Sequence, residues 1–294
     1  MSENLKDLFT QQYSASVALL LQEQGYKLRG LVMTGSHVGL QASPVNQVGA
    51  ISMRNVETRF TPKTHTHPVS ARRWVYPTDK TVDIPIDNFD VLKTIVDVQS
   101  PYVQSATLAA GRAMDDAIID AAFATSKIGE TGSDTETFDT TNFSIAVNFK
   151  STADDGLSVP KLIESNRKFM AANVDLDMEP PTLVVGPQQE ADLLSQTQVT
   201  STDYNNRPVL VEGRVRTFMG YRFIISNRLS LVSGDRACIA FVKSGLYLGI
   251  WQDVRSNVHQ RHDLEADPWE ITTTMSVGAT RLEQGRVIRI LCNE

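Results

Sequence analysis

The chain has 294 residues, with 28 Lys and Arg against 34 Asp and Glu, which gives a formal net charge of −6. Hydrophobic residues make up 41% of it, which excludes a disordered chain, because such chains are poorer in apolar residues. Only 2 Cys are present, Cys238 and Cys292, both in apolar strand-like contexts. A disulfide-stapled fold is therefore excluded and a reducing compartment is predicted. We expect a folded protein with about two domains or one elaborated domain.

The longest apolar run near the start of the chain covers residues 16–21, far short of the roughly 20 residues of a membrane span. No basic segment precedes it, so neither a signal peptide nor a membrane span is predicted. The acidic balance argues against a protein that mainly coats nucleic acid, because Lys and Arg supply most of that affinity.

Residues 1–47 lack the pattern of a compact domain, and a hairpin pattern follows them at 48–86. An amphipathic helix is predicted over residues 5–24, and Gly25, Gly30, Gly35 and Gly39 follow at near-regular spacing. Residues 1–47 thus have the character of an arm laid across another surface, including that of another subunit. Strand-like stretches at 48–60 and 74–86 flank a polar tip and predict a long hairpin. Two strands alone are marginally stable, so this hairpin needs a surface to lie on.

The clearest single element is a helix predicted over residues 101 to about 127. Ser100 is the expected N-cap, Pro101 occupies the first helical position, and Gly129 marks the stop. Small and apolar residues recur at helical spacing along one side: Val103, Ala106, Ala110, Met114, Ala117 and Ala121. This pattern predicts a long spine that packs along one side.

The remaining sequence alternates helix and strand signals. Residues 130–156 are predicted to be a surface excursion around a short strand at 143–149, followed by a helix at 158–172 and a boundary at Pro180-Pro181. An α/β unit is predicted over 182–256, with a helix from Pro187 and strands at 182–186, 213–219, 221–226, 237–242 and 246–251. Two closing strands are predicted at 269–277 and 285–291, joined through a turn at 278–281.

The order of these parts resembles the major capsid protein of tailed bacteriophages, which has the Hong Kong 97-like fold. The local motifs that agree with it are residues 182–187 (TLVVGP), 212–227 (EGRVRTFMGYRFIISN), 277–282 (VGATRL) and 286–290 (RVIRI). The resemblance implies an α+β fold with five segments: an N-terminal arm at 1–47, an extended loop at 48–86, a peripheral domain with the spine helix at 87–180, an axial domain at 181–256, and return strands at 257–294.

The resemblance also implies a function and partners. The chain would self-assemble as hexamers and pentamers into the icosahedral head around double-stranded DNA, without cofactor or catalytic turnover. It would reside in the virion after assembly in the host bacterial cytoplasm. A scaffolding protein, a portal protein and the non-specifically packaged DNA are the implied partners, with a decoration protein as an optional one. An encapsulin-type nanocompartment shell is the alternative that shares the resemblance.

A soluble metal-dependent enzyme is the alternative from another class. The usual catalytic signatures are absent from the sequence, which lowers the weight of this interpretation. His65 and His67 would point to one side of an extended segment, but no Cys or carboxylate lies close in sequence to complete a metal site. His259 and His262 lie near Asp263 in a polar, turn-like stretch, so a solvated loop is favoured there too. We expect no catalytic, cofactor or metal site.

Charge distribution gives a further hypothesis about contacts between subunits. Residues 54–80 contain six basic and two acidic side chains, whereas residues 97–134 contain two basic and six acidic ones. Complementary charges steer docking and fix register, so the basic hairpin of one subunit is expected to lie over the acidic spine of the next. The residues predicted to form this contact are Arg54, Arg59, Lys63, Arg72, Arg73, Arg112, Asp115, Asp116 and Asp120.

Overall fold

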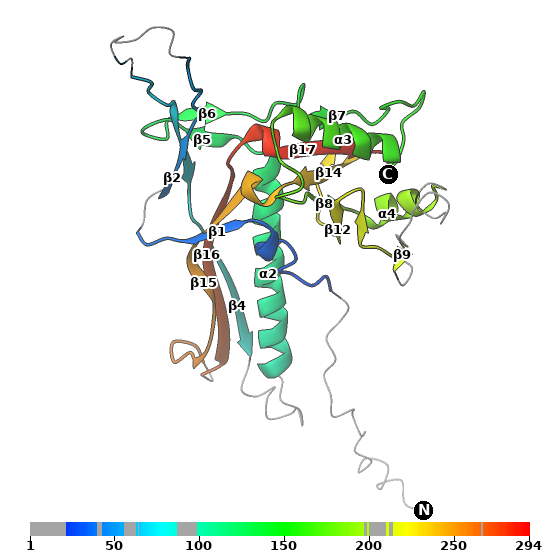
Figure 1. Cartoon of the computed structure of the whole chain (residues 1–294). Coiled ribbons are helices and arrows are strands. Elements are labelled where there is room, and N and C mark those ends of the chain that lie inside the picture. The colour runs from blue at the N-terminus through cyan, green and yellow to red at the C-terminus, as the bar shows by residue number, and fades with distance from the viewer. Residues whose placement is uncertain are drawn as a thin grey trace, which may run out of the picture.

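The computed structural model describes residues 22–39, 43–55, 63, 65–86, 99–196, 199, 210–211, 214–265 and 267–294. Helix α2 (Gln99–Phe123) is the spine of the molecule, roughly 37 Å long at 1.5 Å per residue, and an elongated sheet runs beside it (Figure 1). A hairpin projects at one end of this layer, and a second, more globular sheet with two helices lies to its side (Figure 1). Within the described residues, no helix is both long and apolar enough to cross a membrane.

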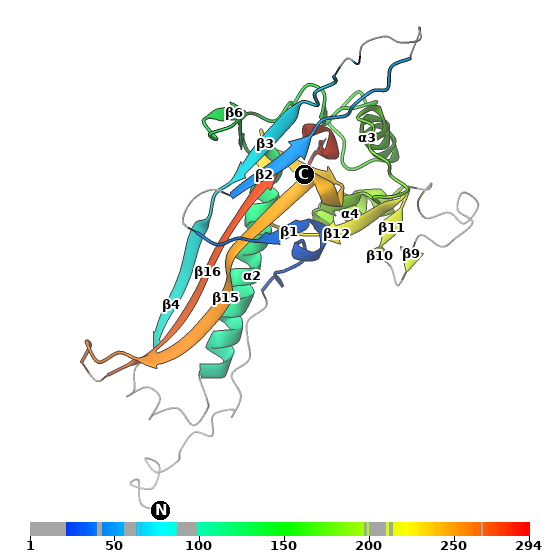
Figure 2. The ribbon, with the colours of Figure 1, turned by 60° about the vertical axis from the view of Figure 1, so that its left-hand side comes forward.

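The elongated sheet has four strands in the order β1-β15-β16-β4. β1 is parallel to β15, and the other neighbours are antiparallel. β4 forms one edge along the length of β16 (Figure 2). Buried Ala106, Ala110 and Met114 of α2 allow the helix to approach the sheet closely. The four strands are β1 (Met33–Ser36), β15 (Leu246–Gln260), β16 (Trp269–Arg281) and β4 (Thr78–Ile86).

The globular part is built on a seven-stranded sheet in the order β11-β12-β8-β14-β17-β7, with β13 paired to β14. Its central strand β8 is a continuous apolar run, and Leu183, Val184 and Val185 are all fully buried, as expected for a strand covered on both faces. Helices α3 (Val159–Ala171) and α4 (Pro187–Leu194) belong to this part. The strands are β11 (Thr217–Phe218), β12 (Tyr221–Ile225), β8 (Thr182–Val185), β13 (Leu231–Val232), β14 (Asp235–Phe241), β17 (Val287–Cys292) and β7 (Ser144–Ile145).

A third sheet lies at the base of the projecting hairpin, in the order β2-β3-β5-β6. We call β2, β3 and the described residues between them the extended hairpin. The strands of this sheet are β2 (Ser43–Val48), β3 (Ser70–Val75), β5 (Ser126–Ile128) and β6 (Asp134–Glu136). A small ribbon of β9 (Leu210–Val211) and β10 (Arg214–Val215) completes the described strands.

The spine helix ends earlier than the sequence indicates. It begins at Gln99, so Ser100 lies inside the helix, and it ends at Phe123, so Lys127 belongs to strand β5. The buried guanidinium of Arg281 donates hydrogen bonds to the carbonyls of Ala122 (2.9 Å) and Ala124 (3.0 Å). This distant side chain satisfies orphan carbonyls at the helix end, a contact that no local sequence pattern reveals.

The predicted turn at 278–281 is wrong, because β16 continues through it to Arg281. A Cβ at Gly278 would lie 2.0 Å from the carbonyl oxygen of Tyr76, so glycine here permits a close approach of the backbone that connects β3 to β4. A glycine of this kind has the same sequence signal as a turn glycine.

Several other boundaries differ from the predictions. The helix predicted over 158–172 is confirmed as α3, and β8, β12 and β14 match their predicted ranges closely. The predicted strand at 143–149 shrinks to β7, that at 213–219 divides into β10 and β11, and that at 246–251 extends to Gln260 as β15. The helix predicted at 5–24 lies almost wholly outside the described residues. The hairpin strands predicted at 48–60 and 74–86 are wrong, because β2 ends at Val48 and pairs with β3, and because β4 pairs with β16 instead. The five-segment division stays a prediction.

Candidate assembly surface

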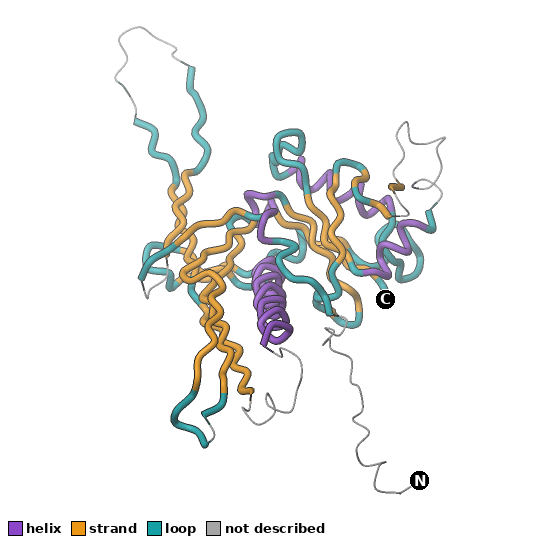
Figure 3. The backbone as a smooth tube through the Cα atoms, turned by 90° about the horizontal axis from the view of Figure 1, so that it is seen from below, coloured by secondary structure: helices purple, strands orange, loops and turns teal. Residues whose placement is uncertain are grey.

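The two arms of the extended hairpin separate beyond its base. β2 and β3 pair over six positions, and the amide of Gly49 donates to the carbonyl of Val69 at 2.7 Å. Residues 50–55 and 65–68 then diverge without forming strands (Figures 1 and 3). These arms carry apolar side chains in solvent: Ile51 is 60% exposed, Met53 103% and Val69 78%. The described residues of the subunit therefore leave these side chains uncovered.

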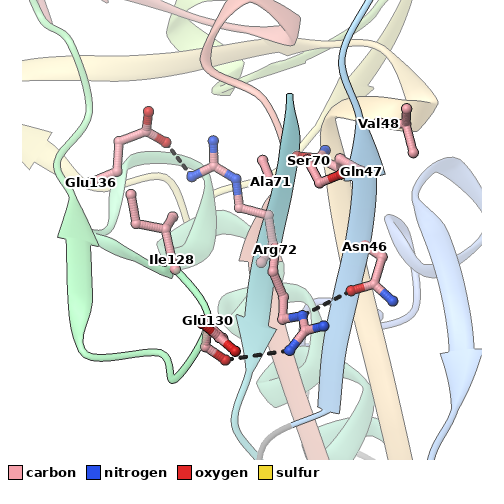
Figure 4. A pocket seen from close by; sticks show the side chains of 11 residues that line it. Asn46, Gln47, Val48, Ser70, Ala71, Arg72, Ile128, Glu130 and Glu136 are labelled. Atoms are coloured by element: carbon pink, nitrogen blue, oxygen red, sulfur yellow. Dashed lines mark hydrogen bonds and ion pairs between the residues drawn. The ribbon is translucent and has the colours of Figure 1, made fainter. Parts of the chain in front are cut away.

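The base of the hairpin is tied to the subunit by polar contacts around an open hollow of about 660 Å³ (Figure 4). The Arg72 side chain donates to Asn46 Oδ1 at 3.0 Å and to the carbonyl of Glu130 at 3.4 Å. Arg73 is buried and forms an ion pair with Glu136, and the Trp74 indole donates to the carbonyl of Gly129 at 2.8 Å. The base is therefore held rigidly while the arms extend from it.

Burial and charge act against each other at this base. Burial by itself would raise the pKa of Glu136, but the hydrogen bond and charge of Arg73 hold that pKa below its ordinary value. Burial lowers the pKa of Arg281 to about 10, and the nearby positive charge of Arg73 acts in the same direction. Glu136 is therefore the carboxylate that compensates two buried guanidinium groups.

The middle of helix α2 contacts residues 25–28, near the start of the described part of the chain. The Asp115 carboxylate is 3% exposed and accepts hydrogen bonds from the backbone amides of Lys27 and Leu28, each at 3.1 Å. The segment before Lys27 crosses the spine helix where Gly25 meets Gly111, and a Cβ on Gly25 would lie 2.2 Å from the Gly111 carbonyl carbon. Burial raises the pKa of Asp115, and the two amide hydrogen bonds oppose that rise. We call this contact the arm clasp.

The predicted contact residues on the spine differ in accessibility. Arg112 donates to Gln22 and to the carbonyl of Glu23, and Asp116 forms a bidentate ion pair with Arg228. Asp115 is bound by the arm clasp, whereas Asp120 is exposed on the helix. Asp120 is thus the most accessible of the predicted acidic contacts.

The predicted basic contacts divide in the same way. Arg54 and Lys63 are exposed on the extended hairpin, Arg72 is half-buried, and Arg73 is buried in its pair with Glu136. Arg59 lies outside the described residues. The hypothesis of a contact between subunits stays a prediction, and Arg54 and Lys63 are its accessible hairpin members.

The four histidines considered as metal ligands do not gather into one cluster. His65 and His67 are exposed on the hairpin arm. His259 lies 3.4 Å from Glu270 and His262 lies 3.3 Å from Asp267, while Arg261 forms ion pairs with both Glu270 and Asp263. Among the described residues, no group of three or more His, Cys, Asp or Glu is arranged to hold a metal ion.

Sequence reasoning missed the apolar side chains of the hairpin arms as contact residues. Ile51 and Met53 lie within a predicted strand, where alternating apolar residues normally face a core. The available signal was that a hairpin so long has no core of its own. The arm clasp left no signal, because its two glycines are far apart in the sequence.

The comparison with known protein families gives one match over nearly the whole chain. The family described as phage capsid protein matches residues 5–294. The chain therefore belongs to the phage capsid protein family.

Solved structures with the same fold agree with this assignment. The capsid of cyanophage P-SCSP1u is similar with a TM-score of 0.77 and 18% identity, over 100% of this chain and 97% of that one. The Mycobacterium phage Che8 structure is similar with a TM-score of 0.71 and 16% identity, over 96% of each chain. The head of Helicobacter pylori bacteriophage KHP40 is similar with a TM-score of 0.73 and 9% identity, over 100% of this chain and 98% of that one. The comparison with curated proteins finds no match.

These findings confirm the fold and the class predicted from the order of segments. The chain has the Hong Kong 97-like fold and is a major capsid protein that forms an icosahedral phage head. It is accordingly a homo-oligomeric component of the virion.

Proposed function

We propose that shell assembly depends on the arms of the extended hairpin, residues 49–55 and 65–69, binding a second copy of the chain. The observation that carries this proposal is the exposure of Ile51, Met53 and Val69 on arms that diverge from their own subunit. Removing such side chains from water contributes about 25 cal/mol per Å² of apolar area. Many repeated contacts of this modest strength suit a closed shell, because each one forms reversibly.

The chain acts in this shell without catalytic turnover, as hexamers and pentamers that enclose double-stranded DNA. A scaffolding protein and a portal protein assist assembly in the host cytoplasm. The net charge of −6 supports an interior that contains DNA without gripping it, because tight binding of phosphates needs an excess of Lys and Arg.

Electron microscopy with size measurement tests the hairpin contact directly. The wild-type chain, expressed alone and with the scaffolding protein of its phage, is expected to form closed shells or capsomer rings. The variants Ile51→Asp and Met53→Asp are expected to remain folded subunits that do not assemble, because both side chains are exposed. Met170→Asp is the matched control, since Met170 is 58% exposed on α3, outside the hairpin. Normal shells from both hairpin variants would overturn the proposal.

The charge contact between hairpin and spine is best tested at accessible residues, Lys63 on the hairpin and Asp120 on the spine. Arg73 is unsuitable for charge reversal, because Arg73→Glu would place a second carboxylate beside Glu136 at a buried position. Lys63→Glu should weaken assembly, and the added change Asp120→Lys should restore it if the two side chains face each other across subunits. Equal assembly of the wild type, the Lys63→Glu variant and the double variant would rule out this charge contact.

A further inference from the structure

Strand β4 has a long edge with no strand beside it. It pairs with β16 over nine positions, from Thr78 to Ile86, and β16 is its only strand partner in the described part of the chain. Figure 2 shows β4 at the outer side of the elongated sheet. The backbone N–H and C=O groups on the free side of an edge strand are able to pair with an added strand.

The two faces of β4 differ. Val82 and Ile84 are half-buried on the face toward α2, where Lys80 Nζ also donates to the carbonyl of Ala113 at 3.1 Å. Thr81 and Asp83 are exposed on the opposite face, and the Thr81 hydroxyl donates to the Asp83 carboxylate. Any strand added to this edge therefore needs apolar residues toward α2 and polar residues on the outer face.

The first arm of the extended hairpin has this alternation and no strand partner. The sequence predicts a strand-like stretch at 48–60, yet β2 ends at Val48, and no strand pairing among the described residues includes 50–55. Along this arm, Ile51 and Met53 alternate with Ser52 and Arg54. If the arm is extended, its apolar side chains share one face and its polar side chains the other.

We propose that residues 49–55 of one subunit add as a fifth strand to the free edge of β4 in a second subunit. Ile51 and Met53 then extend the apolar face formed by Val82 and Ile84. Ser52 and Arg54 lie on the outer face, which carries Asp79, Thr81 and Asp83 on the β4 side. This inference rests on the proposed function, and it names the edge that the hairpin occupies.

The other edges of the described sheets fit less well. β1 offers four residues, and β7 and β11 offer two each. β2 is six residues long and contains Pro44, which lacks an N–H for pairing. β15 has a second free stretch after Ile250, where its pairing with β1 ends, but its register against β16 is irregular between Ile250 and Arg255. β4 is the described free edge that is both regular and long enough for the whole arm, and its Pro85 lies next to the last position.

Cysteine cross-linking between subunits tests the strand addition in assembled shells. Ser52→Cys is combined in turn with Asp79→Cys, Thr81→Cys and Asp83→Cys, which scans the register along the outer face. All four positions are exposed, and the native Cys238 and Cys292 are fully buried, so the engineered thiols are the ones that react. After mild oxidation with diamide, the pair in register should give covalent oligomers on non-reducing gels.

The control is Met53→Cys with the same three partners, because residue 53 lies on the opposite face of the added strand. We expect about tenfold less cross-linking from residue 53 than from residue 52, since a disulfide requires Cβ atoms that face each other. Intact shells with no cross-link from residue 52, or with equal cross-linking from both positions, would overturn the strand addition. If the wild-type chain, without engineered cysteines or oxidant, formed no shells, the proposed function itself would be refuted, and this inference with it.

Discussion

The sheet of β8, β14 and β17 and the arms of the extended hairpin are opposite in construction. In the sheet, Leu183, Ala240 and Ile288 are fully buried. Each of the three strands lies between two other strands. On the arms, Met53 is 103% exposed, and the two arms of the hairpin separate after Gly49. The sheet is complete within one subunit, whereas the arms have apolar surface and backbone groups that another subunit can cover. The free energy of unfolding thus depends mainly on the first region, and we expect assembly to depend on the second.

The largest expected effect separates these two quantities. Phe241→Ala removes a side chain that is 1% exposed in β14, and it should lower the free energy of unfolding by about 3–5 kcal/mol. Met53→Ala should change it by less than about 0.5 kcal/mol, because the side chain is in solvent. Denaturant unfolding of unassembled subunits measures both. Comparable losses from the two variants would contradict the division into a complete core and an unfinished arm.

A buried lysine gives the next effect. Lys161 of α3 is fully buried, and its ammonium group donates to the carbonyls of Asp155 (2.7 Å), Gly156 (2.7 Å) and Leu291 (3.0 Å). It ties the loop before α3 and the end of β17 to the helix. Lys161→Met keeps the packing but leaves three carbonyls without this donor, so we expect a loss of about 2–3 kcal/mol in unfolding free energy.

The control for this prediction is Lys168→Met, on the same helix. Lys168 is half-buried, but its ammonium group donates to the carbonyl of Asn142 at the exposed surface, so its loss should cost about 0.5 kcal/mol or less. If Lys161→Met were as stable as Lys168→Met, the three carbonyls would not depend on the ammonium group.

The arm clasp lies between the two extremes, because it joins a peripheral segment to the spine. Asp115→Ala removes the acceptor for the amides of Lys27 and Leu28, and we expect a loss of about 1–2 kcal/mol. Amide hydrogen exchange should accelerate at these two residues and stay unchanged at Val184 in β8. Protection that persists at Lys27 and Leu28 would show that packing at Gly25 and Gly111 holds the arm without the carboxylate.

The sequence predicted what local patterns encode. Short apolar runs located β8 and β14, and period-3.6 spacing located α3 and most of α2. The order of these elements was sufficient for the family. Contacts between distant residues were not predictable in this way. The cap of α2 comes from Arg281, and the glycine at 278 permits close approach to Tyr76.

The same limit applies to the candidate assembly surface. Charge counting selected Arg73 and Asp115 together with Arg54 and Lys63, because composition does not distinguish a buried charge from an exposed one. Arg73 and Asp115 are bound within their own subunit, and their types alone gave no sign of it. The apolar positions Ile51 and Met53 acquire meaning only once their exposure is known.

The smallest expected effect concerns the pH dependence of the hairpin base. Because the pKa of Glu136 in the folded state lies below its ordinary value of 4.5, the ionised carboxylate stabilises the fold above that value. This contribution is lost as the pH falls through the folded-state pKa. The difference in unfolding free energy between wild type and Glu136→Gln should therefore be constant from pH 7 to about pH 5 and shrink below it. We expect about 1 kcal/mol or less at neutral pH, since the Glu136 side chain is 31% exposed. A difference that grew on acidification would mean that Arg73 does not hold Glu136 in its ionised form.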